Sequence, residues 1–332
     1  MNETATTPIT RPRWLSNRAW PYDVKTFEHN ASRIAYTDTG AGRALLLVHS
    51  GTWTIIWRDL IARLAPRFRV VALDPPAMGL SDPGAGAGIV QTAAAVSALV
   101  TALDLRDLTL VLHDLGGPAG LQAARDWPGR VAGLAAVNCF GWRPAGAGFR
   151  GMLRIVGSGV LRESDVWTGW LPALSSTRYG VGRHFSRADR IAYRRGFGRR
   201  GRRSFHENMH SALHLDFTHV DEGLTAIADR PILTVFGQHN DPLQFQPRWR
   251  AVGSDVEQVV VPHGYHFPMC DAPDLVAAAI TDWHGRKIAS GRPAAQIGSL
   301  CPGPHPDMPA GVCDGSAYPM TAGRDCVLRV CA

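Results

Sequence analysis

The feature that most restricts the fold of this chain is an alternation of short apolar strands with helical segments. Runs with the length and apolar content of strands occur at residues 24–29, 33–37, 44–49, 68–74, 108–113, 131–138, 232–237 and 256–261. Stretches with helical spacing fall at residues 53–64, 90–105, 118–127 and 273–284. Buried strands joined by helices form mostly parallel sheets. We therefore predict an α/β fold with a mostly parallel, eight-stranded sheet and helices on both faces.

The alternation is interrupted once. Between residues 142 and 228 the chain has scattered Trp, Gly and Arg residues and helical fragments, but no convincing apolar strand. An insertion into one sheet domain is the simplest explanation. We predict a core domain formed by residues 1–141 and 229–290, with a helical cap at 142–228.

Composition excludes several classes of function. The chain has 332 residues and 45% hydrophobic content, enough for one large core. Its net charge of +7 is concentrated in an Arg run, Arg194, Arg195, Arg199, Arg200, Arg202 and Arg203. This run fits a solvated helix end better than a nucleic-acid or membrane site. The sequence has no apolar stretch near the roughly 20 residues of a membrane span and no basic-then-apolar leader, so we expect a cytoplasmic protein.

The C-terminal segment 291–332 is rich in Pro, Gly and Cys. It contains four of the six cysteines, Cys301, Cys313, Cys326 and Cys331, without a Cys-x-x-Cys pair. That spacing fits no zinc pattern, so we expect no metal and a poorly ordered tail. A tail disulfide in an exported protein is the alternative.

Ligands of open parallel sheets gather at the carboxyl ends of the strands. The polar residues at these ends are His49, Asp74, Asp114, Asn138, Asp241 and His266. Around Asp114 the sequence Val-Leu-His-Asp-Leu-Gly-Gly-Pro-Ala-Gly, residues 111–120, reads as a strand, a sharp turn and a helix. This context is typical of a nucleophile elbow.

The order of Asp114, Asp241 and His266 resembles the nucleophile, acid and histidine of the α/β-hydrolase superfamily. The resemblance covers about residues 24–290 and includes Asp-Pro-Pro-Ala-Met-Gly-Leu-Ser-Asp at 74–82. Because the elbow carries Asp114 where most members carry serine, it resembles the branch of haloalkane dehalogenases and epoxide hydrolases.

The resemblance implies a two-step hydrolysis of a small apolar organic substrate, without a cofactor. The Asp114 carboxylate, ionised near neutral pH, forms an alkyl ester, and His266 activates a water that hydrolyses it. Asp241 orients His266. The N–H of Leu115 and one from the turn at Ser50 and Gly51 stabilise the oxyanion.

Each assignment has an ordinary structural alternative. The alternative for Asp114 is a helix cap, because Asp is a favoured capping residue. The alternative for His266 is a core histidine, and that for Asp241 is a turn residue. Asp221 is a weaker substitute for Asp241.

Two departures bear on the leaving group. Dehalogenases commonly carry Trp directly after the nucleophile, where this chain has Leu115. Epoxide hydrolases use two cap tyrosines, for which Tyr179 and Tyr193 are available, but His206 occupies the region of the second phenol. Leu112 and Asn138 resemble the dehalogenases and favour cleavage of a carbon–halogen bond, with epoxide opening as the alternative.

Several further side chains are candidates for the substrate pocket, although core packing is an alternative for each tryptophan. They are Trp53, Asn138, Trp142, Trp167, Trp170 and Tyr179. A lyase or ester-cleaving relative, and a binding module without catalysis, remain alternatives for the whole chain. We expect a monomer or homodimer.

Overall fold

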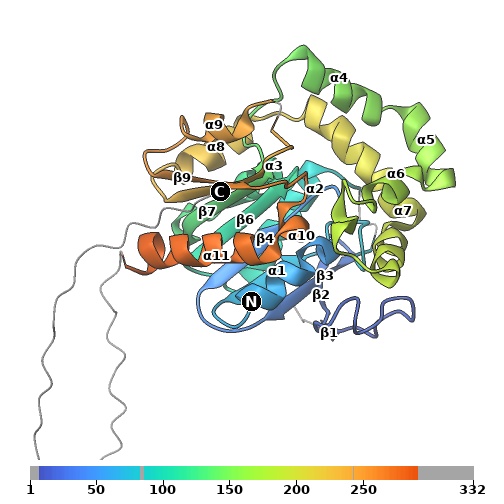
Figure 1. Ribbon diagram of the computed structural model, residues 1–332, viewed down its shortest axis with the longest axis horizontal. Coiled ribbons are helices and arrows are strands. Elements are labelled where there is room, and N and C mark those ends of the chain that lie inside the picture. The colour runs from blue at the N-terminus through green and yellow to red at the C-terminus, as the bar shows by residue number, and fades with distance from the viewer. Residues whose placement is uncertain (1–6, 83–85, 242, 291–332) are drawn as a thin grey trace, which may run out of the picture. The chain divides into compact units, whose positions relative to one another are not determined.

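A mostly parallel sheet forms the centre of the computed structural model, which describes residues 7–82, 86–241 and 243–290 (Figure 1). The nine strands in these residues are β1 (Thr7–Pro8), β2 (Lys25–His29), β3 (Ser32–Thr39), β4 (Ala44–Val48), β5 (Arg69–Leu73), β6 (Leu108–Asp114), β7 (Val131–Cys139), β8 (Ile232–Gly237) and β9 (Val256–Val261). Their order is β1-β2-β3-β5-β4-β6-β7-β8-β9. Strands β1, β2, β3 and β5 pair antiparallel, and all other neighbours are parallel. The eight predicted strands are therefore confirmed, and the two-residue β1 is an addition.

Helices cover both faces of the sheet. The α-helices are α1 (Arg58–Leu64), α2 (Ile89–Ala102), α3 (Gly116–Ala124), α4 (Ala147–Val156), α5 (Gly159–Thr168), α6 (Trp170–Ser175), α7 (Arg187–His214), α8 (Thr218–Ala226), α9 (Phe245–Trp249), α10 (Pro268–Asp271) and α11 (Pro273–His284). Short 3₁₀ turns are Thr54–Trp57, Pro128–Arg130 and Val181–Arg183, and Gly285–Ala289 is a π-helical turn. Helices α2, α3 and α8 pack on one face, and α1, α10 and α11 pack on the other.

Strand β4 illustrates why the sequence folds this way. All five of its residues are buried, and its side chains alternate between two hydrophobic clusters. Leu46 and Val48 join the cluster with α2 and α3, whereas Leu45 and Leu47 join the cluster with α1 and α11. A strand between two helical layers has no solvent-facing side, so a continuous apolar run is the expected sequence.

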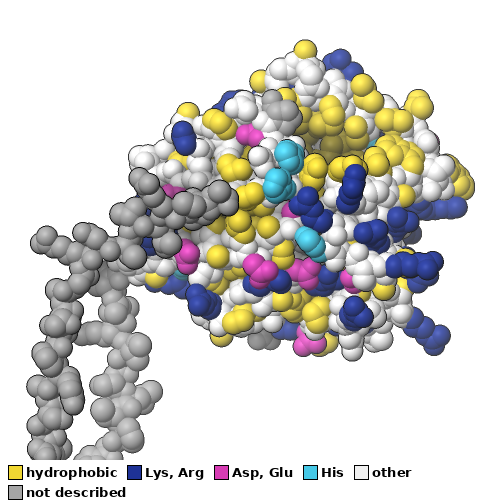
Figure 2. All heavy atoms as spheres, viewed as in Figure 1, with side chains coloured by type: hydrophobic (Ala, Val, Ile, Leu, Met, Phe, Trp, Pro, Cys, Tyr) yellow, Lys and Arg dark blue, Asp and Glu magenta, His cyan; other side chains and the backbone are white. Residues whose placement is uncertain are grey.

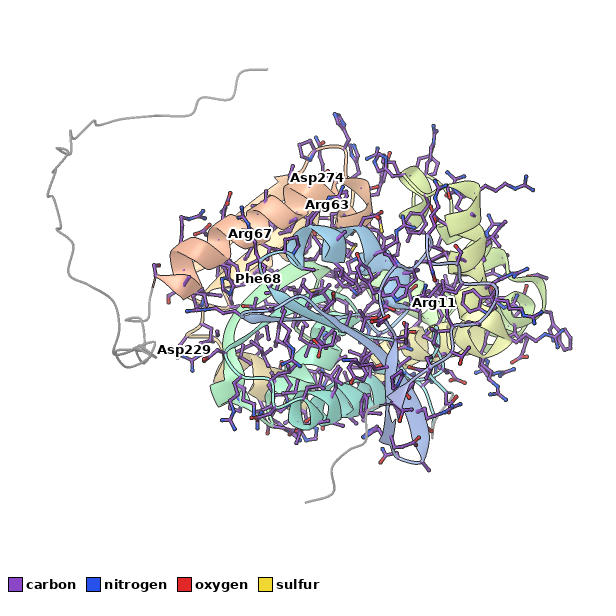
Figure 3. All side chains as sticks on the ribbon, turned by 90° about the horizontal axis from the view of Figure 1, so that it is seen from below. Arg11, Arg63, Arg67, Phe68, Asp229 and Asp274 are labelled. Atoms are coloured by element: carbon purple, nitrogen blue, oxygen red, sulfur yellow. The ribbon has the colours of Figure 1, made fainter. Side chains whose placement is uncertain are left out.

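Helices α1 and α11 are linked across the surface by an ion pair that Figure 3 labels. The Arg63 guanidinium donates two hydrogen bonds to the Asp274 carboxylate, at 2.6 and 3.1 Å. Asp274 is largely exposed, so water and salt screen the pair and its contribution to stability is small.

The insertion between β7 and β8 consists of helices joined by loops. No strand occurs between residues 142 and 228, a range that the structure describes fully. Helices α4, α5 and α6 pack against α7, but α8 packs against α3 of the sheet domain. A Cβ on Gly223 of α8 would lie 1.8 Å from the Leu121 carbonyl oxygen, so the two helices are in backbone contact. Helix α8, inside the predicted cap, thus lies with the core layer.

The prediction for the C-terminal tail concerns residues outside the described ranges. The tail at 291–332, with Cys301, Cys313, Cys326 and Cys331, lies outside the described residues. The cysteines that are described, Cys139 and Cys270, are buried and reduced. Within the described ranges, no helix has both the length and the apolar character needed to cross a bilayer.

Candidate active site

Asp114 occupies a sharp turn between β6 and α3. Its φ of 51° lies in the left-handed region, an uncommon conformation for a residue other than glycine. The close packing of this turn requires Gly116, where a Cβ would lie 2.3 Å from the Val48 carbonyl oxygen. The turn directs the Asp114 carboxylate toward the carboxyl edge of the sheet, beside the start of α3.

Two imidazoles face the Asp114 carboxylate. His266 Nε2 lies 3.7 Å and His49 Nε2 lies 3.9 Å from Asp114 Oδ2. Burial raises the pKa of the Asp114 carboxyl group, but the His266 ring, His113 and the Leu115 N–H outweigh it and leave the pKa below its ordinary value. Asp114 is therefore a carboxylate at neutral pH, as a nucleophile must be.

The main chain of His266 is fixed by two side chains beneath it. Asn138 donates from Nδ2 to the carbonyl oxygens of Tyr265 (2.8 Å) and His266 (2.9 Å), and its Oδ1 accepts from the Gly237 N–H. His113 Nε2 donates to the same His266 carbonyl at 2.7 Å. Asn138 thus holds the loop of His266 and does not line the pocket for which it was a candidate.

Asp241 lies just after β8, as predicted, but its carboxylate caps α9. Oδ1 accepts from the Phe245 N–H at 2.6 Å and Oδ2 from the Gln246 N–H at 2.9 Å. Both Asp241 and His266 are described, and no hydrogen bond or ion pair joins them. Asp221 is in α8, beside the core layer. The predicted contact between acid and histidine is absent from this structure.

A carboxylate that the sequence analysis did not consider lies nearer to the histidine loop. Asp271 of α10 accepts from the Tyr265 N–H at 2.7 Å. Burial raises the pKa of Asp271, while the Tyr265 N–H, Arg183, His184 and His266 lower it.

An apolar cavity of about 280 Å³ opens above Asp114 and His266. Its polar lining consists of the side chains of His49, Thr52, Asp114, Ser175, Tyr193 and His266. Its apolar lining consists of Leu115, Phe149, Met152, Leu153, Val156, Leu171, Phe197, Phe205, Met209 and Phe267. Figure 2 shows hydrophobic side chains gathered around a hollow over the helices of the insertion. The cavity has room for a small organic molecule and few groups to bind a polar one.

Comparison with known proteins identifies the family. The model of the alpha/beta hydrolase family matches residues 45–279. The chain belongs to this family. It is a hydrolase, and its fold is the α/β-hydrolase fold that the sequence predicted.

Relatives of this α/β hydrolase include dehalogenases. Haloalkane dehalogenase 2 of Mycobacterium tuberculosis is 29% identical over 279 residues, covering 80% of this chain and 96% of the relative. A haloalkane dehalogenase of Mycolicibacterium smegmatis is 32% identical over 186 residues, covering 51% of this chain and 58% of the relative.

Solved structures share the fold at lower identity. A crystal structure of DbjA superposes with a TM-score of 0.70 at 19% identity, covering 80% of this chain and 99% of that one. Epoxide hydrolase CorEH superposes with a TM-score of 0.67 at 22% identity, covering 79% and 98%.

Within this hydrolase, Gly51 and Leu115 line the cavity as expected, but Ser50 does not. The Ser50 hydroxyl is buried and hydrogen-bonded to Thr92 (2.8 Å) and Asn208 (2.5 Å). Its side chain therefore ties the turn to α2 and α7.

The predicted pocket tryptophans and Tyr179 lie outside the cavity lining. Trp53 is buried and its indole donates to the Tyr193 carbonyl at 3.0 Å, and Trp142 packs on Trp249. Trp167 is 67% exposed and Tyr179 55% exposed. Trp170 lies against the ring of His206. Core packing and surface positions account for all five.

His206 is fully buried in the insertion. Its Nε2 lies 3.3 Å from Asp165 Oδ2, and its Nδ1 donates to the Val156 carbonyl at 2.5 Å. This pair joins α5 to α7. His206 is thus a structural residue, and the phenol that lines the cavity is Tyr193.

Proposed function

We propose that this hydrolase cleaves a carbon–halogen bond in a small apolar substrate through an ester on Asp114. The observation that carries the proposal is an ionised carboxylate at an elbow, 3.7 Å from His266, at the base of an apolar cavity. The dehalogenases among its relatives support the same chemistry.

The two steps follow from these groups. In the first, an Asp114 oxygen attacks the sp³ carbon, a C–O bond forms, and the halide leaves with the electron pair of the broken bond. In the second, His266 accepts a proton from water, and the resulting hydroxide adds to Cγ of Asp114. Collapse of the intermediate breaks the bond between the acyl carbon and the alkyl oxygen, the leaving alkoxide takes the proton from His266 and departs as the alcohol, and the carboxyl group loses its proton to regenerate the carboxylate.

Helices α4, α6 and α7 supply most of the apolar wall, which supports the proposed role of the insertion as a cap over the site. The cap excludes bulk water, so that the carboxylate is poorly solvated and reacts with a carbon centre. We expect the second-step water to enter beside the partly exposed His266.

Epoxide opening is the second candidate. Tyr193 favours it, because its phenol lines the cavity and is hydrogen-bonded to Ser175 at 3.0 Å. Burial raises the pKa of Tyr193 to about 12, so the hydroxyl keeps its proton at neutral pH. Tyr179 lies at the surface, and His206 has a structural role. The described cavity lining therefore has one phenol, whereas two are expected for epoxide opening.

Purified protein screened against haloalkanes and epoxides tests the proposal. We expect halide release with a haloalkane and no diol from epoxides. Diol formation without halide release would select the second candidate. Product formed without any adduct on the protein would favour an ester-cleaving or lyase reaction, and ligand binding without turnover would indicate a binding module.

A further inference from the structure

Two backbone N–H groups of the turn after His49 are already engaged by a side chain. The N–H groups of Gly51 and Thr52 both donate to His49 Nδ1, at 2.8 and 3.0 Å. An oxyanion hole of this kind uses two donors, and the Leu115 N–H at Asp114 supplies one. Of the turn at Ser50 and Gly51, which was expected to supply the second donor, the Gly51 N–H is therefore already engaged.

These two bonds determine the tautomer of His49. Because Nδ1 accepts two N–H donors, it carries no proton, and the proton of the neutral ring lies on Nε2. The side chain is only 4% exposed and lines the cavity. Its Nε2 has no hydrogen-bond partner among the described residues and faces Asp114 Oδ2 at 3.9 Å.

We infer that His49 is the second oxyanion donor of this enzyme, acting through Nε2–H on Oδ2 of the Asp114 ester. The inference rests on the proposed function, because it assigns a role within the ester-hydrolysis step. In that ester, Oδ1 carries the alkyl group and Oδ2 is the carbonyl oxygen.

The chemistry of the second step explains the position of the donor. When water adds to Cγ, its proton passes to His266 and the carbonyl electron pair moves onto Oδ2. The negative charge then develops opposite the His49 N–H. A separation of 3.9 Å is too long for a hydrogen bond in the resting enzyme. The bond that forms as the oxyanion develops stabilises the transition state more than the ground state.

A pair of substitutions separates this role from a structural one. His49→Asn keeps an oxygen acceptor for the Gly51 and Thr52 N–H groups but removes the donor toward Asp114. His49→Gln keeps a terminal N–H but moves the acceptor away from the turn. His284→Gln, which removes a buried histidine from α11, serves as the control for general loss of stability.

We expect His49→Asn to slow hydrolysis of the ester by about 10²- to 10³-fold, the usual cost of one oxyanion donor. The Asp114 adduct should accumulate in intact-protein mass spectra, while the rate of the first halide burst stays near that of wild type. His49→Gln should hydrolyse the ester faster than His49→Asn. An active Asn variant beside an inactive Gln variant would show a purely structural role and overturn the inference.

Two further results would also overturn it. One is a loss confined to the halide burst, which would make His49 a leaving-group donor. The other is a wild-type ¹⁵N NMR spectrum in which His49 is protonated at Nδ1, a measurement that needs no variant. If wild-type enzyme turns over no haloalkane or epoxide, the proposed function fails as a whole. A failure of the inference alone leaves wild-type turnover intact.

Discussion

His266 Nε2 and Asp114 Oδ2 are 3.7 Å apart, so the proposed base lies beside the proposed nucleophile without a normal-length hydrogen bond. This spacing leaves the carboxylate free to attack carbon. It also keeps the imidazole close enough to activate a water directed at Cγ once the ester has formed. In the proposed mechanism the two residues act in successive steps, so substitutions at each should have different consequences.

Asp114→Asn should abolish the halide burst, because an amide is uncharged and a poor nucleophile. Asparagine tolerates a positive φ, so the elbow should keep its conformation. His266→Gln should still form the ester but fail to hydrolyse it, and the protein mass should rise by that of the alkyl group. The double variant is the control: an adduct on it would come from another nucleophile, and turnover by Asp114→Asn would exclude the ester mechanism.

Tyr193→Phe separates the two leaving groups. Among the described residues the phenol is the one tyrosine hydroxyl in the cavity lining, and an epoxide oxygen needs a proton that a halide does not. We expect halide release to remain within about threefold of wild type, since general acid catalysis, worth about 10²- to 10⁴-fold, is not required. Ser175→Ala, which removes the partner of the phenol but keeps the phenol, is the matched control. A large loss of halide release in Tyr193→Phe alone would assign the hydroxyl to the leaving group.

The sheet could be predicted because the residues that indicate each strand are neighbours in the sequence. Strand β4 is buried on both faces, so all of its residues are apolar. Asp114 ends the buried run of another such strand, β6. The cavity walls are different. Phe149 comes from α4, whereas Phe197 and Phe205 come from α7, and nothing in their local sequence indicates which face meets Asp114.

The positions of the tryptophans also depend on tertiary packing that the local sequence does not reveal. Trp53 and Trp142 fit a pocket by composition, yet an indole N–H finds its partner through tertiary packing. The Trp53 indole N–H donates to the Tyr193 carbonyl, 140 residues away in the sequence. His49 lay at a predicted strand end, but its role depends on a tautomer that only the turn geometry reveals.

Asp241→Asn tests the remaining member of the predicted triad. Both carboxylate oxygens of Asp241 accept backbone N–H groups of α9, and neither bonds to His266. We therefore expect mainly a loss of about 1 kcal/mol of stability, as for other helix caps. Ester hydrolysis should fall far less than the ~10⁴-fold typical of a replaced triad acid. A hydrolysis defect as severe as that of His266→Gln would give Asp241 the orienting role.

Buried histidines should make the fold sensitive to acid. Burial is the largest cause that lowers the pKa of His49 and His113 well below 6.5, and burial with the nearby Arg43 lowers that of His284 to about 4. Below pH 6.5 the unfolded chain therefore binds protons that the folded chain does not. Stability is fully present above pH 6.5 and falls as the pH drops toward the folded-state pKa values, by at most about 1.4 kcal/mol per pH unit for each histidine.

Urea unfolding at pH 7, 6 and 5 measures this dependence. His284→Gln should reduce the slope of unfolding free energy against pH by about one histidine's contribution, even if the amide changes the absolute stability. Glutamine at this site keeps polarity without a titrating group, so the slope reports protonation alone. The buried Asp74 opposes the trend, because burial raises the pKa of its carboxyl group above the ordinary 3.8 and the folded chain then binds this proton more tightly than the unfolded chain. An unfolding free energy that stays constant between pH 7 and 5 would mean that these histidines are protonated in the folded chain.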